Sequence, residues 1–207
     1  MTGKRIKAAP TKNTLLNLKR QLQFLEDGHS LLERKRELLT RLVYQRIGEY
    51  RKIRDQSHEA IKQAYHWISM LQLRMGTRAV NQAALGVQPV LDLKILPRRN
   101  LGVEFPSVTG ERMPLNPVGL LGTDPSFDET RLHFAEASLL LAKMGEVSMS
   151  LNRLIAEQRK AQKRVNALRY NIIPQYRNTI RFIENALEEE ERNALFQVKV
   201  LRDQKRI

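Results

Sequence analysis

Cysteine is absent from all 207 residues of the sequence. This absence excludes disulfides and Cys-based zinc or iron–sulfur sites, and it permits a reducing compartment without requiring one. Long apolar runs are missing too: the longest near a helical segment is Leu139–Ala142, whereas a membrane-spanning helix needs about 20 apolar residues. The basic N-terminus, MTGKRIKAAP, lacks an apolar core and a small-residue cleavage site, so no secretory signal is predicted. We therefore expect a cytoplasmic protein without a membrane span.

Nucleotide-binding and metal-binding motifs are also lacking. The sequence contains neither G-x-x-x-x-G-K-[ST] nor G-x-G-x-x-G, so it predicts no nucleotide or dinucleotide site. His29 stands four residues before Glu33, but a metal site needs at least a third ligand on the same face. The acidic run at 188–191 points in four directions around a helix, which favours a solvated face over a cation site. We expect no catalytic residue, no cofactor and no metal.

Glycine and proline are concentrated in one quarter of the chain. Between Gly76 and Ser126 lie 6 of the 10 glycines and 6 of the 8 prolines. Because both residues interrupt regular helices, this part is predicted to be non-helical. The pattern divides the chain into an N-terminal arm at 1–76, a middle segment at 77–127 and a C-terminal arm at 128–207.

The N-terminal arm has apolar residues at three-then-four spacing, which is typical of a helix. Written as heptads, 13 of its 18 seam positions are apolar, and a seam sustained for this length predicts a coiled coil. Of the polar residues that interrupt the seam, we expect three to weaken pairing locally and to help fix its register: His29, Arg36 and Arg46. The seam leucines of this arm are Leu15, Leu18, Leu22, Leu25, Leu32 and Leu39.

The C-terminal arm is predicted to begin with a capping box formed by Ser126 and Glu129. Its seam is apolar at 9 of 10 positions up to residue 172. Beyond Pro174 the apolar stripe resumes one residue later, which changes the local supercoil. A proline inside a helix also removes one hydrogen bond, so a bend is predicted at Pro174. Prominent seam residues of this arm are Leu151, Leu154, Val165, Leu168 and Ile172.

The two arms are similar in length, each on the order of 100 Å at about 1.5 Å per residue. Folded back at the middle segment, they pair antiparallel with both termini at one tip. Within the middle segment, residues 90–95 and 101–105 alternate around turn residues at 97–100, which predicts a short β-hairpin. The predicted fold class is all-α: a long two-helix antiparallel coiled coil with an irregular middle segment containing a short β-hairpin.

The formal net charge of +14 is the main compositional clue to partners. Residues 1–76 carry 16 Lys and Arg against 7 Asp and Glu, and their basic cluster spans 34–54. This cluster suits a nucleic acid, a solvated helix face or a protein partner. No stacking aromatics interleave it, and Trp67 and Tyr50 have the spacing of core residues. Residue chemistry alone therefore indicates a long basic coiled-coil interaction protein, with a nucleic-acid-binding or scaffold role as the alternative.

Segments in both arms resemble the D subunit of V-type and A-type ATPases. In the first arm these are PTKNTLLNLKR at 10–20 and GHSLLERKR at 28–36. In the second arm they are RVNALRYNIIP at 164–174, TIRFI at 179–183, EER at 190–192 and FQVK at 196–199. The sequence departs from the family pattern at Arg169, where a carboxylate is common, and at Asn193, which interrupts an acidic-basic run.

The resemblance implies a non-catalytic rotor shaft that transmits torque between a catalytic head and a membrane ion-translocating rotor, at the cytoplasmic face of the membrane. The paired ends, at about 4–20 and 187–207, would stand inside a head of A and B subunits. A small F subunit would bind the side of the shaft, and the middle segment would face the socket subunit, C or d, of the membrane rotor. Basic residues near the tip would contact carboxylates of the head: Arg5, Lys12, Lys19, Arg20, Arg202 and Arg206.

Overall fold

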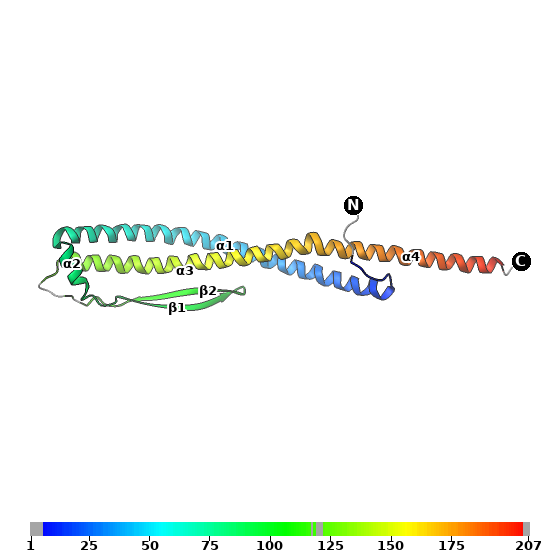
Figure 1. Ribbon diagram of the computed structural model, residues 1–207, viewed down its shortest axis with the longest axis horizontal. Helices are drawn as coiled ribbons and strands as arrows, with labels where there is room; N and C mark the ends of the chain where they lie inside the picture. Colours follow the sequence, from blue (N-terminus) through cyan, green and yellow to red (C-terminus); the bar gives the residue numbers. More distant parts are fainter. Residues whose placement is uncertain (1–5, 117, 119–121, 205–207) are drawn as a thin grey trace. The chain divides into compact units, whose positions relative to one another are not determined.

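The computed structural model describes residues 6–116, 118 and 122–204. Along the chain, its helices and strands are α1 (Lys12–Met75), α2 (Thr77–Ala84), β1 (Leu91–Asn100), β2 (Val103–Arg112), α3 (Pro125–Ala167), the π-helical turn η1 (Leu168–Ile172) and α4 (Ile173–Gln204) (Figure 1). The predicted fold class is confirmed: the chain consists of long helices, with a two-stranded antiparallel hairpin between them in the sequence. Within the described part of the chain, no helix is long and apolar enough to cross a membrane.

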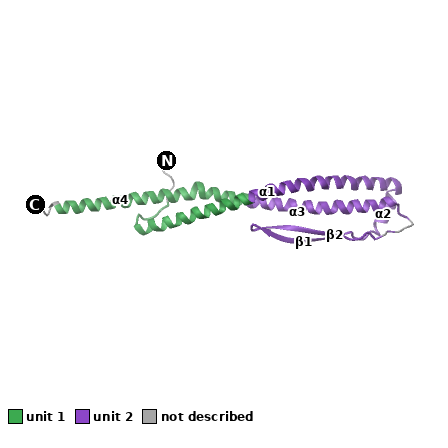
Figure 2. Cartoon of the chain, turned by 180° about the vertical axis from the view of Figure 1, so that it is seen from behind, with its two compact units in different colours: residues 1–38, 158–207 green, residues 39–157 purple. Residues whose placement is uncertain are grey.

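The chain forms two compact units (Figure 2). The first unit combines residues up to 38 with residues from 158 onward, and thus contains the start of α1, the end of α3, η1 and α4. The second unit spans residues 39–157 and contains the rest of α1, α2, the hairpin and most of α3. Both units pair α1 with a later helix.

The first unit is held by an apolar cluster between α1 and α4. Leu18, Ile180 and Ile183 are buried at its centre. Leu15, Leu22, Tyr176 and Leu187 are partly buried and pack against them. These residues follow the seam spacing of both arms, and fully burying one such side chain stabilises the fold by about 1.5–3 kcal/mol. The apolar stripe in the sequence is therefore the contact surface between the helices of this unit.

The π-helical turn η1 lies directly before Pro174. Here the backbone N–H of Ile173 donates to the carbonyl of Leu168, five residues back instead of four. A π turn contains one more residue than the α-helical turn that it replaces. It therefore accommodates the one-residue slip of the apolar stripe, and it places the break in α-helical bonding next to a proline, which has no N–H to donate. The bend expected at Pro174 stays a prediction.

The second unit contains a helix that the sequence pattern did not predict. Residues 77–84 form α2, although the whole middle segment was expected to be non-helical. Val80 of α2 packs with Leu71 of α1 and Phe127 of α3 in a buried cluster. Gly76, with a φ of 78°, makes the tight turn from α1 into α2. The other glycines and prolines of the middle segment follow α2. The prediction based on their concentration therefore ended the helical structure one short helix too early.

The hairpin is longer than predicted, and its turn lies elsewhere. Each strand has ten residues, and the pairing ends with Asn100 opposite Val103. The turn is therefore Leu101–Gly102, with φ values of 49° and 78°, and not the predicted 97–100. Two positive φ values in a two-residue turn match the twist of antiparallel strands. Pro97 lies inside β1, where its missing N–H is tolerated because β1 pairs only with β2 among the described residues.

Within the second unit, the hairpin packs against the helices through β2. Val103, Phe105 and Ser107 are buried on one face of β2, whereas β1 is exposed over nearly its whole length. The N–H of Val108 donates to a carboxylate oxygen of Glu146 on α3 at 2.9 Å. A Cβ on Gly110 would lie 2.7 Å from Leu139 Cδ1, so glycine lets strand and helix approach closely without moving that leucine side chain.

The start of α3 is capped by Asp124. The prediction that Ser126 is the cap is wrong. Asp124 Oδ2 accepts hydrogen bonds from the backbone N–H of Ser126, at 3.2 Å, and from the Ser126 hydroxyl. Pro125 occupies the first helical position, where its missing N–H has no helical partner to lose. The serine hydroxyl thus donates a hydrogen bond to the cap residue. That residue lies two positions before the predicted one.

Candidate partner interfaces

The eleven predicted seam residues are all buried or half-buried in the structure. Leu39, Leu154 and Val165 are the most deeply buried of them. None of these side chains carries a reactive group, so what they provide is a rigid pairing of helices. The surfaces that remain available for partners are the polar flanks of the pairs, the exposed strand β1 and the exposed end of α4.

The six basic residues expected to contact the head fall into two groups. Arg5 and Arg206 lie outside the described residues. The other four are exposed: Lys12, Lys19, Arg20 and Arg202. The Nζ atoms of Lys12 and Lys19 already lie within 2.7 Å and 2.6 Å of carboxylates on α4. The two lysines therefore contribute to pairing within the chain, whatever they contact outside it.

Three ion pairs form a ladder between α1 and α4 in the first unit. Their members are Lys12–Glu191 at 2.7 Å, Lys19–Glu184 at 2.6 Å and Glu26–Arg177 at 2.6 Å. Each step moves seven residues forward on α1 and seven residues back on α4, as expected for antiparallel helices in one heptad register. The ladder was not predicted, although the seven-residue spacing of these charges is present in both arms of the sequence.

The polarity of the ladder opposes a shift in register, because the third pair has its charges reversed. A slip of one heptad in one direction places Lys19 opposite Arg177. A slip in the other direction places Glu26 opposite Glu184. Like charges facing each other are unfavourable, whereas three pairs of one polarity would tolerate either slip. The ladder thus specifies the alignment of the two helices more than it stabilises them.

The outermost pair of the ladder also alters proton affinities. The side-chain hydrogen bond with Glu191, together with its negative charge, raises the pKa of Lys12 above its usual value. The same hydrogen bond and the positive charge of Lys12 lower the pKa of Glu191. Both groups are fully exposed, so the pair is screened by solvent and salt. Such a contact is easily exchanged for one with a partner.

Of the polar seam residues, Arg36 and Arg46 contact neighbouring elements, whereas His29 lies near Glu33 of its own helix. Arg36 Nη1 donates to Gln162 Oε1 on α3 at 3.4 Å, and His29 Nδ1 lies 3.9 Å from Glu33. Arg46 Nη1 bonds Glu49 at 2.6 Å, and its guanidinium lies 5.7 Å from the centre of the Phe105 ring on β2. Arg46 therefore helps to seat the hairpin, a role that seam spacing did not reveal.

Trp67 and His133 stack on each other between α1 and α3, with ring centres 5.7 Å apart and planes 12° apart. Trp67 is half-buried in this contact. Among the described residues, no group of three His, Cys, Asp or Glu side chains is placed to hold a metal ion.

The C-terminal part of α4 exposes large apolar side chains. Leu195, Phe196, Val198 and Leu201 each leave between 62% and 72% of their surface in solvent. Grouped apolar exposure of this kind is typical of a surface that another protein covers. This part of α4 extends beyond the Lys12–Glu191 pair, the outermost pair of the ladder. The end of α4 is therefore the most prominent apolar interface candidate of the first unit.

Comparison with known families decides the affiliation of the chain. The sequence profile of the ATP synthase D subunit matches residues 14–203. The chain belongs to the family of ATP synthase D subunits. It is 36% identical over 198 residues to the D subunit of the A-type ATP synthase of Methanosphaera stadtmanae, covering 93% of this chain and 92% of that one.

Further relatives support the same family. The D subunit of the V-type ATP synthase of Thermotoga neapolitana is 34% identical over 196 residues, which cover 94% of this chain and 97% of that protein. The D subunit of the A-type ATP synthase of Pyrococcus furiosus is 32% identical over 198 residues, covering 94% and 92% respectively. The resemblance noted in the two arms is thus confirmed, and it extends through the middle segment as well. As a D subunit, the chain is one component of an ATP synthase complex.

Proposed function

We propose that this D subunit is the non-catalytic central-stalk shaft of a V/A-type rotary ATPase, which transmits torque between the catalytic head and the membrane ion-translocating rotor. The proposal is supported mainly by the way the helices of the first unit are paired. Two helices are paired by an apolar seam, aligned by a ladder whose third ion pair is reversed in polarity, and continued by an exposed apolar end of α4. A torque-bearing element needs a fixed register and a surface that a surrounding head can enclose.

At the head end, we assign the exposed Arg20 and Arg202 to contacts with carboxylates of the A and B subunits. Lys12 and Lys19 can join them by exchanging their partners on α4. Exposed ion pairs contribute about 0–1 kcal/mol each. Weak, replaceable contacts suit a surface that turns inside its housing, because no single orientation is strongly preferred.

The second unit carries α2, the hairpin and the loop that leads into α3. We assign this region to the socket subunit, C or d, of the membrane rotor, and the side of the paired helices to the F subunit. The complex would then lie at the cytoplasmic face of the membrane. Strand β1 is exposed, and the aromatic residues of this unit are only partly buried, so both are available for contacts with such partners.

Rotation provides the direct test of this proposal. Because the sequence contains no cysteine, one cysteine introduced at the exposed Arg99 of β1 is the only thiol of the isolated chain. It can be biotinylated before the chain is assembled with the head alone, without the socket subunit that is assigned to this surface. A bead attached there should rotate when the head hydrolyses ATP. The control carries the same label but lacks ATP. Active hydrolysis with a stationary bead would contradict the shaft role.

The nucleic-acid alternative depends on the net charge of +14. Part of the basic cluster on α1 is already paired, since Arg46 contacts Glu49 and Arg54 contacts Asp55. A nucleic-acid-binding role requires tight DNA or RNA binding that weakens steeply as salt rises. We expect only weak binding from the assembled complex in a salt titration.

A further inference from the structure

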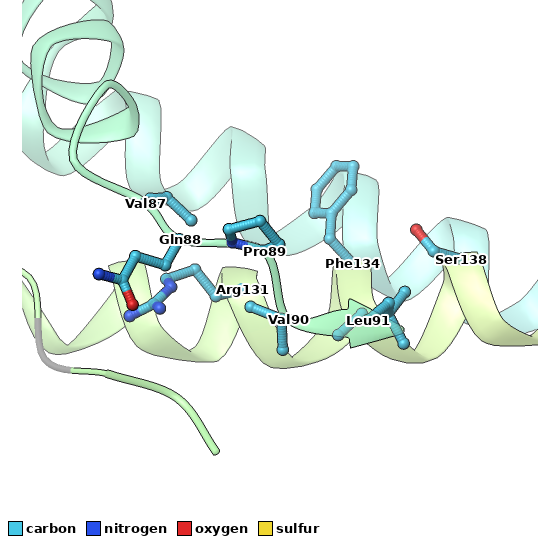
Figure 3. A pocket seen from close by; sticks show the side chains of 9 residues that line it. Val87, Gln88, Pro89, Val90, Leu91, Arg131, Phe134 and Ser138 are labelled. Carbon is cyan, nitrogen blue, oxygen red and sulfur yellow. The ribbon is translucent and has the colours of Figure 1, made fainter. Parts of the chain in front are cut away.

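A hollow of about 360 Å³ lies in the second unit, between the segment at 87–91 and helix α3 (Figure 3). Val87, Val90 and Phe134 contribute apolar walls, and Arg131 lies at one end together with Gln88. A second hollow, of about 190 Å³, shares Val87, Arg131 and Phe134 with the first and is otherwise almost wholly apolar. Arg131 is thus a buried cation in contact with two largely apolar hollows.

Arg131 is 8% exposed, and only one side of its guanidinium has acceptors. Nη1 donates to the carbonyl oxygen of Asn116 at 2.9 Å and to Asp128 Oδ1 at 3.1 Å. No acceptor among the described residues lies within hydrogen-bonding distance of Nε or Nη2, and both atoms are shielded from solvent. A buried donor without an acceptor is destabilising, and native structures contain few of them.

The two unpaired nitrogens define the chemistry of the acceptor that would fit them. Nε and Nη2 lie on the same edge of the guanidinium, with parallel N–H bonds. A carboxylate matches this edge because its two oxygens accept both hydrogens at once. A monodentate acceptor such as a hydroxyl would leave one nitrogen unpaired. Arg131 is one of the residues that line the hollow, and the other walls are mostly apolar side chains, so the carboxylate is expected to accompany an apolar group.

Access to this edge depends on the wall formed by residues 87–90. Gln88 is exposed and is held by a hydrogen bond from the Asn116 side chain at 2.6 Å. This contact joins two side chains at the surface, so the Gln88 side chain can move while Val87 stays packed against the buried cluster around Val80. Movement of Gln88 would open the end of the hollow at which Arg131 lies.

We propose that this hollow is a receptor for one apolar side chain and its neighbouring carboxylate on the socket subunit of the membrane rotor. Nε and Nη2 of Arg131 donate two parallel hydrogen bonds to the carboxylate, while the apolar side chain fills the space between Val87, Val90 and Phe134. The choice of partner rests on the proposed function, which assigns the second unit to that protein. The carboxylate chemistry rests on the guanidinium edge alone.

The first experiment measures binding to the purified socket subunit. Arg131→Lys keeps the charge but removes the two-hydrogen edge, so its dissociation constant should rise about tenfold, equivalent to about 1.4 kcal/mol. Arg159→Lys, at an exposed position of α3 in the first unit, is the matched control and should bind like the wild type. Circular dichroism verifies that both variants fold, and assembly with the head should be the same for both. Equal binding by Arg131→Lys and the wild type would overturn the proposed contact.

The second experiment tests the site without any partner. Isovalerate, a branched apolar group carrying a carboxylate, is titrated into the full-length wild-type chain while the Arg131 Nε–H resonance is followed by NMR. We expect a saturable shift that isobutanol, of similar shape but without charge, does not produce. An unchanged resonance would overturn the carboxylate site. If isovalerate binds but the wild type assembles with neither socket nor head, the proposed function fails and the site stands.

Discussion

At the scale of single residues, Gly110 shows how one missing side chain positions the hairpin. A Cβ at this position would lie 2.6 Å from Leu93 Cδ2 and 2.7 Å from Leu139 Cδ1. Gly110→Val should therefore lower the free energy of unfolding by about 1–3 kcal/mol through overpacking. Urea denaturation measures this change. Adding Leu139→Ala to Gly110→Val should recover part of the loss.

Gly145 of α3 is the matched control, because a Cβ there meets nothing within 4 Å. Gly145→Ala should raise the free energy of unfolding by about 0.5–1 kcal/mol, since alanine favours a helix more than glycine does. Equal effects of Gly110→Val and Gly145→Ala would contradict the close approach of β2 to α3. The sequence did not distinguish these two glycines, because the difference comes from residues distant in sequence.

Asp124 gives the second unit a defined dependence on acid. The hydrogen bond from the Ser126 hydroxyl, aided by Arg74, lowers the pKa of Asp124 below its usual value of 3.8. A carboxyl whose pKa is lower in the folded state stabilises the fold above its unfolded pKa, and the stabilisation is lost as the pH falls through the folded value. The free energy of unfolding should therefore decrease below about pH 4 in the wild type, with a smaller decrease in Asp124→Asn.

Urea titrations between pH 7 and pH 3 measure this difference. Glu129→Gln, which changes an exposed carboxylate in the first turns of the same helix, is the control and should retain the wild-type dependence. If Asp124→Asn lost stability in acid as steeply as the wild type, the cap would not be responsible. By sequence, Ser126 and Glu129 fitted a capping box, whereas the residue that caps the helix is Asp124, two positions earlier.

At the scale of secondary-structure elements, the ladder makes a prediction about coupling. Arg177→Glu places two carboxylates opposite each other, and adding Glu26→Arg restores an opposite pair in reversed order. Each single substitution should lower the free energy of unfolding by about 0–1 kcal/mol, and the double variant should recover the loss. The coupling energy from this double-mutant cycle should shrink in 1 M salt.

The double-mutant cycle measures stability and does not measure helix register directly. It is therefore compared with a reference ion pair outside the ladder. Arg54 and Asp55 form an exposed pair on α1 alone. Reversing both should change stability little and should not affect pairing with α4. A coupling energy near zero for Glu26 and Arg177, equal to that of the reference pair, would mean that the ladder does not contribute to alignment.

The helices and the seam could be predicted from the sequence, because a heptad pattern sustained over dozens of residues has few alternative explanations. Three features escaped prediction for physical reasons. Helix α2 is stabilised by packing of Val80 against α1 and α3, which its eight residues do not reveal. The hairpin turn needs positive φ at Leu101, a conformation that leucine rarely adopts. Arg131 has an unpaired edge only because of the fold around it.

At the scale of the whole molecule, the proposed shaft must resist torque, and the seam is where that resistance should be measurable. Val165 is 1% exposed. Val165→Asp buries a charge without a partner and should lower the free energy of unfolding by about 3 kcal/mol or more. Asn171→Asp, at an exposed position of η1, introduces the same charge where water can solvate it, and should change stability by less than about 0.5 kcal/mol.

In the assembled complex, the same two variants separate hydrolysis from its mechanical use. Val165→Asp should still permit ATP hydrolysis by the head, because the shaft contributes no catalytic residue in the proposed role. It should reduce ATP-driven ion transport in reconstituted vesicles, since helices with a weakened seam yield when one end is turned against the other. Asn171→Asp should retain full coupling. Full ion transport per ATP in Val165→Asp, with its stability loss verified, would mean that torque does not depend on the paired helices.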